Sequence, residues 1–364
     1  MSDQIQATKA RGRMLQSQPL GLQLGRAGVC AVLISISLLL LTVPMVAKDK
    51  RQSRLDADHR NSEAVLWSNP SDIASRDLFY GPGGKAHEPH TTYTFIKEDL
   101  NGSNPKFDVS DENGTKWRVK LGLEAQPEVA ATRLLWAVGY FTDEDYFLPV
   151  LQVQNMQPLK RGRKLIAPDG TMHNVRLRRY LKGEKKIGDW EWRDNPFSGT
   201  REFSGLRVMM ALLNNWDLKT ENNAAFQEKD EAHDAPLHYM VSDLGATFGS
   251  AGITFPLSRS KSNLREYSHS KFIKHVTPEY VDFDAPARPS LWRLVNLKAF
   301  RMRMHLRWIG QQIPRADARW MGQVLSQLSE EQIRQAFRAA GYSPQEVEEF
   351  ANVVEERIKE LNQL

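Results

Sequence analysis

The chain is poor in the residues that form disulfides and metal centres. Cys30 is its only cysteine, so an intramolecular disulfide is excluded. The nine histidines include no pair at helical metal-ligand spacing, and no cysteines accompany them in a zinc pattern. Glycines are grouped just before Lys85, but no phosphate-binding loop of the form G-x-x-x-x-G-K-[ST] follows. These absences exclude a disulfide-bonded fold and a zinc module, and they argue against a P-loop nucleotide site.

A strong charge imbalance is also absent. The net charge of +5 is mild for 364 residues, so it does not indicate nucleic acid, and we expect no nucleic-acid partner. With 26% charged and 41% hydrophobic residues, the composition is that of an ordinary globular protein. No internal repeat is visible, and the length allows one large or two modest cores.

The N-terminal region predicts a membrane anchor. Residues 1–26 are polar and basic without helical periodicity, which indicates a flexible tail. Residues 27–47 carry no charged side chain, and a run of about 20 apolar residues matches the hydrocarbon thickness of a bilayer. A cleaved signal peptide is the competing interpretation, but Met45-Val46-Ala47 lacks a small residue at the −3 position. We therefore expect an uncleaved single-pass anchor, with an orientation that the evenly distributed flanking charges leave open.

The next segments predict a linker followed by a small sheet. Residues 48–90 are polar and end in a turn rich in glycine and proline, which is typical of a linker. From Thr91 onward, short apolar runs alternate with Asn-Gly turns, which indicates hairpins. Pro127 then begins a helix that Gly139 ends. The strands expected before this helix are 93–96, 107–109 and 116–122.

Further strands are expected at 146–151 and 175–180, within a basic part of the chain. Residues 160–186 contain ten lysines and arginines, and only Asp169 and Glu184 are acidic. A solvated hairpin face with alternate arginines pointing outward is the interpretation we favour. The alternative is a docking surface for an acidic partner or an anionic lipid.

The centre of the chain contains a pattern suited to phosphoryl transfer. A helix-compatible run breaks at two asparagines, and Asp217, Lys219 and Asn222 follow as D-x-K-x-x-N. Later, an apolar strand-like run ends at Asp243, just before Leu244-Gly245. In phosphoryl transfer one carboxylate orients the attacking hydroxyl, while a second carboxylate and a carboxamide hold Mg²⁺ on the nucleotide phosphates. A turn rich in Asn and Asp, without a catalytic role, is the alternative.

This pattern resembles the catalytic loop and D-F-G segment of protein kinases. It is more similar to the atypical branch of HipA-like, phosphatidylinositol and secretory-pathway kinases. Asn215-Trp216 stands where protein kinases have His-Arg, Leu244 replaces Phe, and no Ala-Pro-Glu follows. The roles that the resemblance implies are a catalytic base for Asp217, contact with the transferred phosphate for Lys219, and Mg²⁺ binding for Asn222 and Asp243.

The resemblance extends to the predicted sheet and helix before this loop. A lysine on the third strand and a glutamate at the start of the next helix follow the order of a kinase small lobe. Lys120 would then neutralise the nucleotide phosphates and Glu128 would hold it by an ion pair, with Glu124 as a competing partner. The loop at 101–106 has one glycine where protein kinases have three, and Ser103 and Lys106 are the expected phosphate contacts.

Together these patterns predict an α+β fold with a two-lobed, kinase-like domain. The expected activity is transfer of the ATP γ-phosphoryl group, with Mg²⁺, to a hydroxyl on an unknown protein, lipid or small molecule at the membrane. The alternatives are a catalytically silent nucleotide-binding scaffold and a nucleotidyl (AMP) transferase on the same fold. The predicted layout is a tail (1–26), a transmembrane helix (27–47), a linker (48–90), a small lobe (91–183), a large lobe (184–310) and C-terminal helices (311–364), two of them amphipathic within 328–364.

Overall fold

The computed structural model describes most of the chain after residue 61. The described residues are 62–90, 92–102, 104–228, 235–249, 261–284, 297, 301 and 304–364. All of them belong to one compact unit, Lys50–Leu364. The predicted tail and the predicted membrane span, 27–47, lie outside them. Within the described residues, no helix combines the length and apolar character needed to cross a bilayer.

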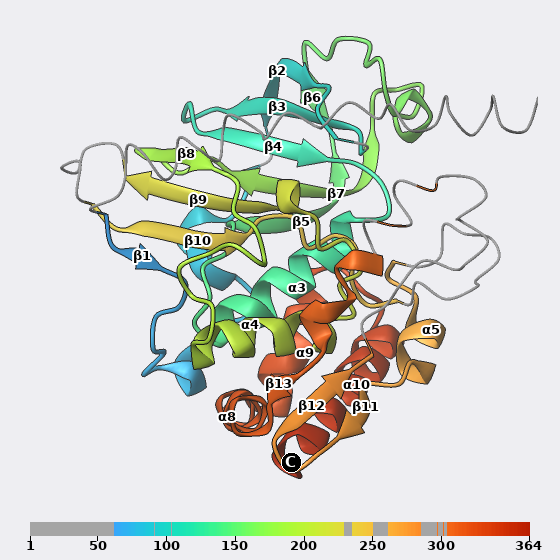
Figure 1. The fold of residues 1–364 in the computed structure, drawn as a ribbon. Coiled ribbons are helices and arrows are strands. Elements are labelled where there is room, and N and C mark those ends of the chain that lie inside the picture. Colours follow the sequence, from blue (N-terminus) through green and yellow to red (C-terminus); the bar gives the residue numbers. More distant parts are fainter. Residues whose placement is uncertain are drawn as a thin grey trace, which may run out of the picture. The chain divides into compact units, whose positions relative to one another are not determined.

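A six-stranded sheet, drawn at the top of Figure 1, contains the predicted hairpins. Its strand order is β5-β7-β4-β3-β2-β6, and the pairs β2/β3, β3/β4 and β4/β7 are antiparallel. The bounds are β2 (Tyr93–Asp99), β3 (Lys106–Asp111), β4 (Lys116–Lys120), β5 (Asp145–Leu151), β6 (Val153–Gln154) and β7 (Met172–Arg179).

The two faces of this sheet differ sharply in polarity. Successive side chains of a strand point to opposite faces, so Trp117 and Val119 of β4 pack in an apolar core. Lys120 points to the other face, where the strand register aligns it with Lys106 on β3 and Arg176 on β7. The charged face of the sheet is therefore the one available for a polar ligand.

A second, four-stranded sheet contains the strand that leads into the predicted metal-binding Asp243. Its order is β1-β10-β9-β8, and the antiparallel pair β9/β10 joins the two segments that follow the D-x-K-x-x-N motif. The bounds are β1 (Ala64–Val65), β8 (Glu184–Gly188), β9 (Asn223–Glu228) and β10 (Leu237–Val241).

The prediction of a linker at 48–90 is wrong from residue 62 onward. Strand β1 pairs in parallel with β10, and Leu66, Ile73 and Leu78 are buried in the main core. Three short 3-10 helices complete the segment: η1 (Ile73–Ser75), η2 (Gly81–Gly83) and η3 (Lys85–His87). A two-residue strand is too short to show an alternating pattern, and the few apolar residues that anchor the segment stand singly among polar ones.

Helices cover the side of the unit opposite the six-stranded sheet, and a small third sheet lies beside them (Figure 1). The two amphipathic helices predicted within 328–364 are present, and each begins with a capping box, at Ser329 and at Ser343. The bounds are α3 (Ala125–Ala137), α4 (Arg201–Leu212), α5 (Leu264–His269), β11 (Ile273–Val276), β12 (Tyr280–Phe283), β13 (Ile313–Pro314), α8 (Arg315–Leu325), α9 (Glu330–Ala339) and α10 (Pro344–Asn362).

Helix α3 connects the six-stranded sheet to the helices. It packs against β5 and β7 on one side and against α9 on the other (Figure 1). Its apolar residues share one core with those of α4 and of α8 to α10. The first turn of α3 is thereby fixed beside the charged face of the sheet, where it presents acidic side chains to Lys120.

Candidate active site

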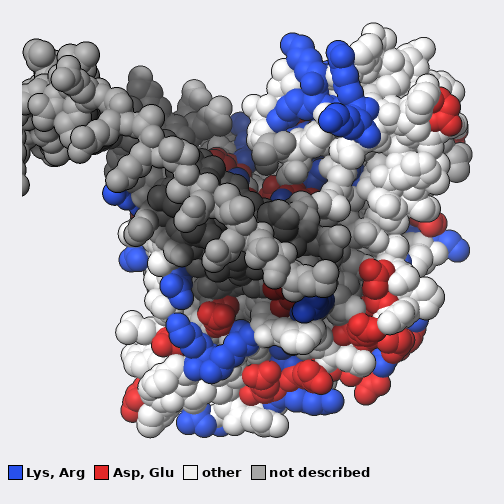
Figure 2. Space-filling model, turned by 90° about the vertical axis from the view of Figure 1, so that its right-hand side faces the viewer, with Lys and Arg blue, Asp and Glu red and all other residues white. Residues whose placement is uncertain are grey.

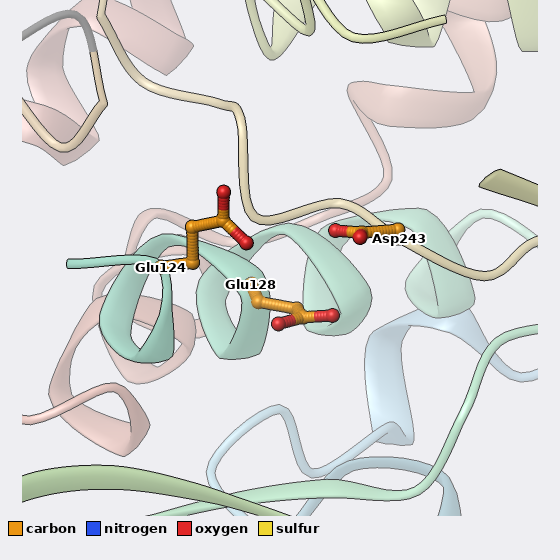
Figure 3. A group of neighbouring side chains, drawn as sticks. All are labelled: Glu124, Glu128 and Asp243. Carbon is orange, nitrogen blue, oxygen red and sulfur yellow. The ribbon is translucent and has the colours of Figure 1, made fainter. Parts of the chain in front are cut away.

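Three carboxylates surround the ammonium group of Lys120. Its Nζ lies 2.9 Å from Oε2 of Glu124, 2.9 Å from Oε2 of Glu128 and 3.1 Å from Oδ1 of Asp243. Glu124 caps α3 and Glu128 lies in its first turn, whereas Asp243 follows β10 (Figure 3). The predicted ion pair between Lys120 and Glu128 is present, and Glu124 contacts the same ammonium group instead of competing for it.

A second cation, Arg176, binds the far side of Glu128. Its Nη2 and Nε donate to the Glu128 carboxylate at 3.0 and 3.3 Å, and its Nη1 lies 3.3 Å from Oδ1 of Asp145. Arg176 is only 4% exposed, so the prediction that the arginines of this hairpin point outward is wrong for it. Val175 and Leu177 occupy the core face of β7, which leaves Arg176 on the charged face beside Lys120.

The charges of this cluster support one another. Burial lowers the pKa of Lys120, but Asp243, Glu128 and Glu124 outweigh it and raise that pKa above its ordinary value. Burial raises the pKa of Glu128, while contact with Arg176 and Lys120 opposes the rise and favours the carboxylate. Although burial opposes it, the attraction of Lys120 lowers the pKa of Asp243, and Lys120 and Lys261 lower that of Glu124 to about 2. The ammonium group is thus firmly charged at neutral pH.

The D-x-K-x-x-N loop begins where α4 ends. Asn214 adopts a left-handed conformation (φ 50°), which asparagine tolerates better than most residues. Its Nδ2 donates to the carbonyl of Gly249 at 2.7 Å, and Oδ1 of Asn215 accepts from the backbone N–H of Asp217 at 3.1 Å. The two asparagines predicted as the break therefore turn the chain out of α4 and fix the backbone at Asp217. Lys219 Nζ lies 3.1 Å from Oδ2 of Asp217.

Strand pairing brings Asn222 beside Asp243. Val241 of β10 is opposite Asn223 of β9, so the residues just beyond that pair are also adjacent. The carbonyl of Asn222 accepts from the backbone N–H of Asp243 at 3.3 Å. The Asn222 Nδ2 donates to the carbonyl of Asp217 at 2.6 Å. The structure thus links Asp217, Asn222 and Asp243 directly through hydrogen bonds.

A cleft of about 290 Å³ opens between the charged face of the six-stranded sheet and the β9/β10 segments. Lys106 faces it and lies 3.5 Å from Asp99, and burial lowers the pKa of Lys106. A larger hollow of about 700 Å³ shares part of its wall, at Arg118 and the 180–184 segment. Ser103 lies outside the described residues. The lining residues are Lys106, Arg118, Lys120, Glu128, Arg176, Arg178, Tyr180, Leu181, Glu184, Lys186, Glu221, Phe226, Ser242 and Asp243.

The acidic groups of the site differ in how freely they could bind a divalent cation. Carboxylate oxygens of Glu124, Glu128 and Asp243 lie within 4.8 Å of one another, but the ammonium group of Lys120 already contacts all three. The Asp243 side chain is 35% exposed and lines the cleft, which leaves it accessible to a ligand. Because Nδ2 of Asn222 is bound to Asp217, its Oδ1 remains as the donor atom. Mg²⁺ prefers oxygen donors, so a carboxylate and an amide oxygen are chemically of the kind that the predicted metal would take.

Comparisons with known proteins give only distant likenesses. No family model and no curated protein matches the chain. Among solved structures, the Helicobacter pylori proinflammatory kinase CtkA is similar at 10% identity and a TM-score of 0.42, over 76% of this chain and 97% of that one. A Golgi casein kinase is similar at 10% identity and a TM-score of 0.33. The Golgi casein kinase with Mn/ADP bound is similar at 12% identity and a TM-score of 0.31. Each of these two likenesses covers 95% of this chain and 94% of the other chain. These neighbours are kinases, but likenesses at such TM-scores assign no family.

Proposed function

We propose that this chain is a kinase-like phosphotransferase that binds ATP with Mg²⁺ and transfers the γ-phosphoryl group to a hydroxyl. One observation carries the proposal. The buried ammonium group of Lys120 is held between Glu128 on α3 and Asp243 after β10, at a cleft bordered by both sheets. An oriented cation beside an accessible carboxylate is what binding of a metal–triphosphate requires.

The residues at the cleft form two groups: some would bind the nucleotide, and others orient the binding residues. Lys120 and Lys106 would face the phosphates, because both line the cleft. Glu128 and Glu124 hold the Lys120 ammonium in place, and Arg176 in turn holds Glu128. Positioning by charged hydrogen bonds of this kind is stronger than by neutral ones.

The loop supplies the groups for chemistry. Asp243 and Asn222 would hold Mg²⁺, which neutralises negative charge on the phosphates when bound. Asp217 would accept the proton of the attacking hydroxyl, and its Oδ2 lies 3.1 Å from Nζ of Lys219. Lys219 would also contact the transferred group.

Two features outside the cleft complete the proposal. The segment 27–47 would anchor the domain to a membrane, as its uncharged composition predicts. In the basic cluster 160–186, Arg176, Arg178 and Lys186 line the cleft, and exposed residues outside the cleft lining, such as Lys160, Arg163 and Lys185, would be available to an acidic partner or an anionic lipid.

Calorimetric titration of the full-length chain with Mg²⁺-ATP tests the proposal. Asp243→Asn is expected to abolish Mg²⁺-dependent binding, because the variant loses the charge that holds the metal. Asp217→Asn is expected to bind like wild type and to turn over about 10²–10⁴-fold more slowly. Asp194→Asn, an exposed residue away from the cleft lining, is the matched control. A wild-type chain without affinity for ATP at millimolar concentration would refute the enzyme. A wild-type chain that binds Mg²⁺-ATP without turnover would favour the silent scaffold.

A further inference from the structure

The connection between β2 and β3 folds directly onto the Lys120 cluster. On its inner side, Nδ2 of Asn104 donates to the Glu124 carboxylate. The carbonyl of Pro105 accepts from the backbone N–H of Leu121 at 3.0 Å, which ties the connection to the end of β4. Lys106, the next residue, lines the cleft. Any displacement of this connection would therefore reach Glu124, and through Glu124 the ammonium group of Lys120.

On its outer side, the same connection is held by one arginine from a distant part of the chain. Nη2 of Arg161 donates to the carbonyls of Asp99 and Asn101 at 2.7 and 3.3 Å, and its Nη1 donates to the carbonyl of Gly102. A guanidinium group presents its donors in a rigid fork, so one side chain can bind the carbonyls of three residues between 99 and 102.

The backbone around Arg161 also donates hydrogen bonds to β2. The N–H groups of Lys160 and Arg161 donate to the Glu98 carboxylate on β2 at 2.8 and 3.0 Å. Gly162 adopts a left-handed conformation (φ 77°), and a Cβ on it would lie 2.5 Å from Cβ of Pro105. The chain after β6 thus packs closely against the β2–β3 connection, by polar contacts in both directions and without space for a side chain at Gly162.

We propose that Arg161 is a positioning residue for nucleotide binding: it holds the β2–β3 connection over the cleft without touching the nucleotide. This inference rests on the proposed function. The connection contains a single described glycine, Gly102, and its backbone must be held if its N–H groups are to face phosphates. Arg161 supplies that restraint by binding the carbonyls on the opposite side of the same peptide units. Affinity for ATP should therefore depend on a residue of the basic cluster that lies outside the cleft lining.

The same segment offers a matched control. Lys164 is exposed and only three residues from Arg161, and it makes no contact with the carbonyls of the connection. Basic side chains gather at the top of the face shown in Figure 2, over the part of the chain between β6 and β7. Lys164→Ala removes one of these charges but keeps the contacts between Arg161 and the β2–β3 connection. It therefore distinguishes positioning of the connection from general electrostatic attraction.

The test compares Arg161→Ala, Arg161→Lys and Lys164→Ala in the full-length chain by two measurements. Hydrogen exchange of the β2–β3 connection reports directly whether the connection is held. Steady-state kinetics reports KM for ATP separately from kcat. Loss of hydrogen bonds from a charged group predicts a rise of roughly tenfold or more in KM for Arg161→Ala, with faster exchange and nearly unchanged kcat. Arg161→Lys should be intermediate, and Lys164→Ala should match wild type.

Two results would overturn the proposal. In the first, Arg161→Ala matches Lys164→Ala in both measurements. In the second, exchange accelerates while KM stays at the wild-type value, which would make the contact purely structural. A wild-type chain that binds no ATP would instead refute the proposed function, and the exchange rates alone would still show whether Arg161 holds the connection.

Discussion

Replacement of Lys120 by methionine should destabilise the fold far more than loss of an ordinary surface ion pair. Lys120→Met keeps a long unbranched side chain but removes the cation that contacts Glu124, Glu128 and Asp243 together. Removal of one partner of a buried pair typically costs about 3–5 kcal/mol. Arg176 still compensates Glu128, and Lys261 still compensates Glu124. We therefore expect a loss near the lower end of that range, about 3 kcal/mol.

The same variant should become sensitive to divalent cations. Without the ammonium group, three carboxylates with oxygens within 4.8 Å of one another are left facing a common point. Hard cations prefer such oxygen donors, so Mg²⁺ or Mn²⁺ should restore part of the stability that Lys120→Met loses. The stability of the control variant, Lys186→Met, should not respond to these cations. The carboxylates also repel each other, which raises their pKa in the folded variant above the unfolded value. Stability of the variant should consequently fall as the pH rises from about 4 toward neutrality.

Urea unfolding of the full-length chain, with and without the cation, measures both effects. The matched control is Lys186→Met, which removes a lysine that pairs with Asp189 at 2.6 Å and whose side chain is 45% exposed. Loss of such a partly exposed pair should cost at most about 1 kcal/mol. If Lys120→Met loses no more than Lys186→Met, and shows no response to the cation, the reasoning about a buried, charge-coupled site is refuted.

Three further changes test other parts of the structure. Gly245→Ala would place a Cβ 2.6 Å from Cβ of Glu124, so we expect a loss of about 1–3 kcal/mol in urea unfolding, and wild-type stability would contradict this contact. Arg357 is 2% exposed and donates to the carbonyl of Leu212 at 2.8 Å, which fixes the end of α4. Arg357→Met should therefore lower the unfolding free energy by about 2–3 kcal/mol. A loss below about 0.5 kcal/mol would be inconsistent with that role. Although burial opposes it, hydrogen bonds from Trp117 Nε1 and two backbone N–H groups hold the pKa of Asp111 below its ordinary value. The contribution of Asp111 to the free energy of unfolding should therefore be present above about pH 4 and lost at lower pH. Acid should destabilise wild type more steeply than Asp111→Asn, and parallel profiles of stability against pH for the two proteins would argue against this role.

The sequence was informative wherever a local pattern determined the contact. The alternation in β4 assigns Trp117 and Val119 to the core and Lys120 to the opposite face. The order of a lysine strand before a helix with an acidic start resembles a kinase small lobe, and this resemblance predicted the pair between Lys120 and Glu128. The roles assigned to Asp217, Lys219, Asn222 and Asp243 remain predictions, although the structure brings the three acidic and amide residues together.

Contacts between distant segments could not be predicted in this way. Arg176 was assigned to an outward face because a single strand does not show which of its faces a neighbouring sheet edge or helix covers. The strand β1 consists of two residues, too few for any periodicity, and its pairing with β10 depends on the folded core. Arg161 belongs to a basic run whose composition indicates only solvation, and its role depends on three carbonyls some 60 residues away in the chain.

The central claim is phosphoryl transfer at the cleft, and the products formed from ATP test it most directly. The full-length chain would be incubated with ATP labelled at the α or the γ position, with a membrane extract as the source of hydroxyl acceptors and Asp243→Asn as the control. We predict that wild type converts ATP to ADP and moves only the γ label onto an acceptor, and that Asp243→Asn adds nothing above the extract alone. Formation of AMP with transfer of the α label would contradict the claim, as would a wild-type chain no more active than Asp243→Asn.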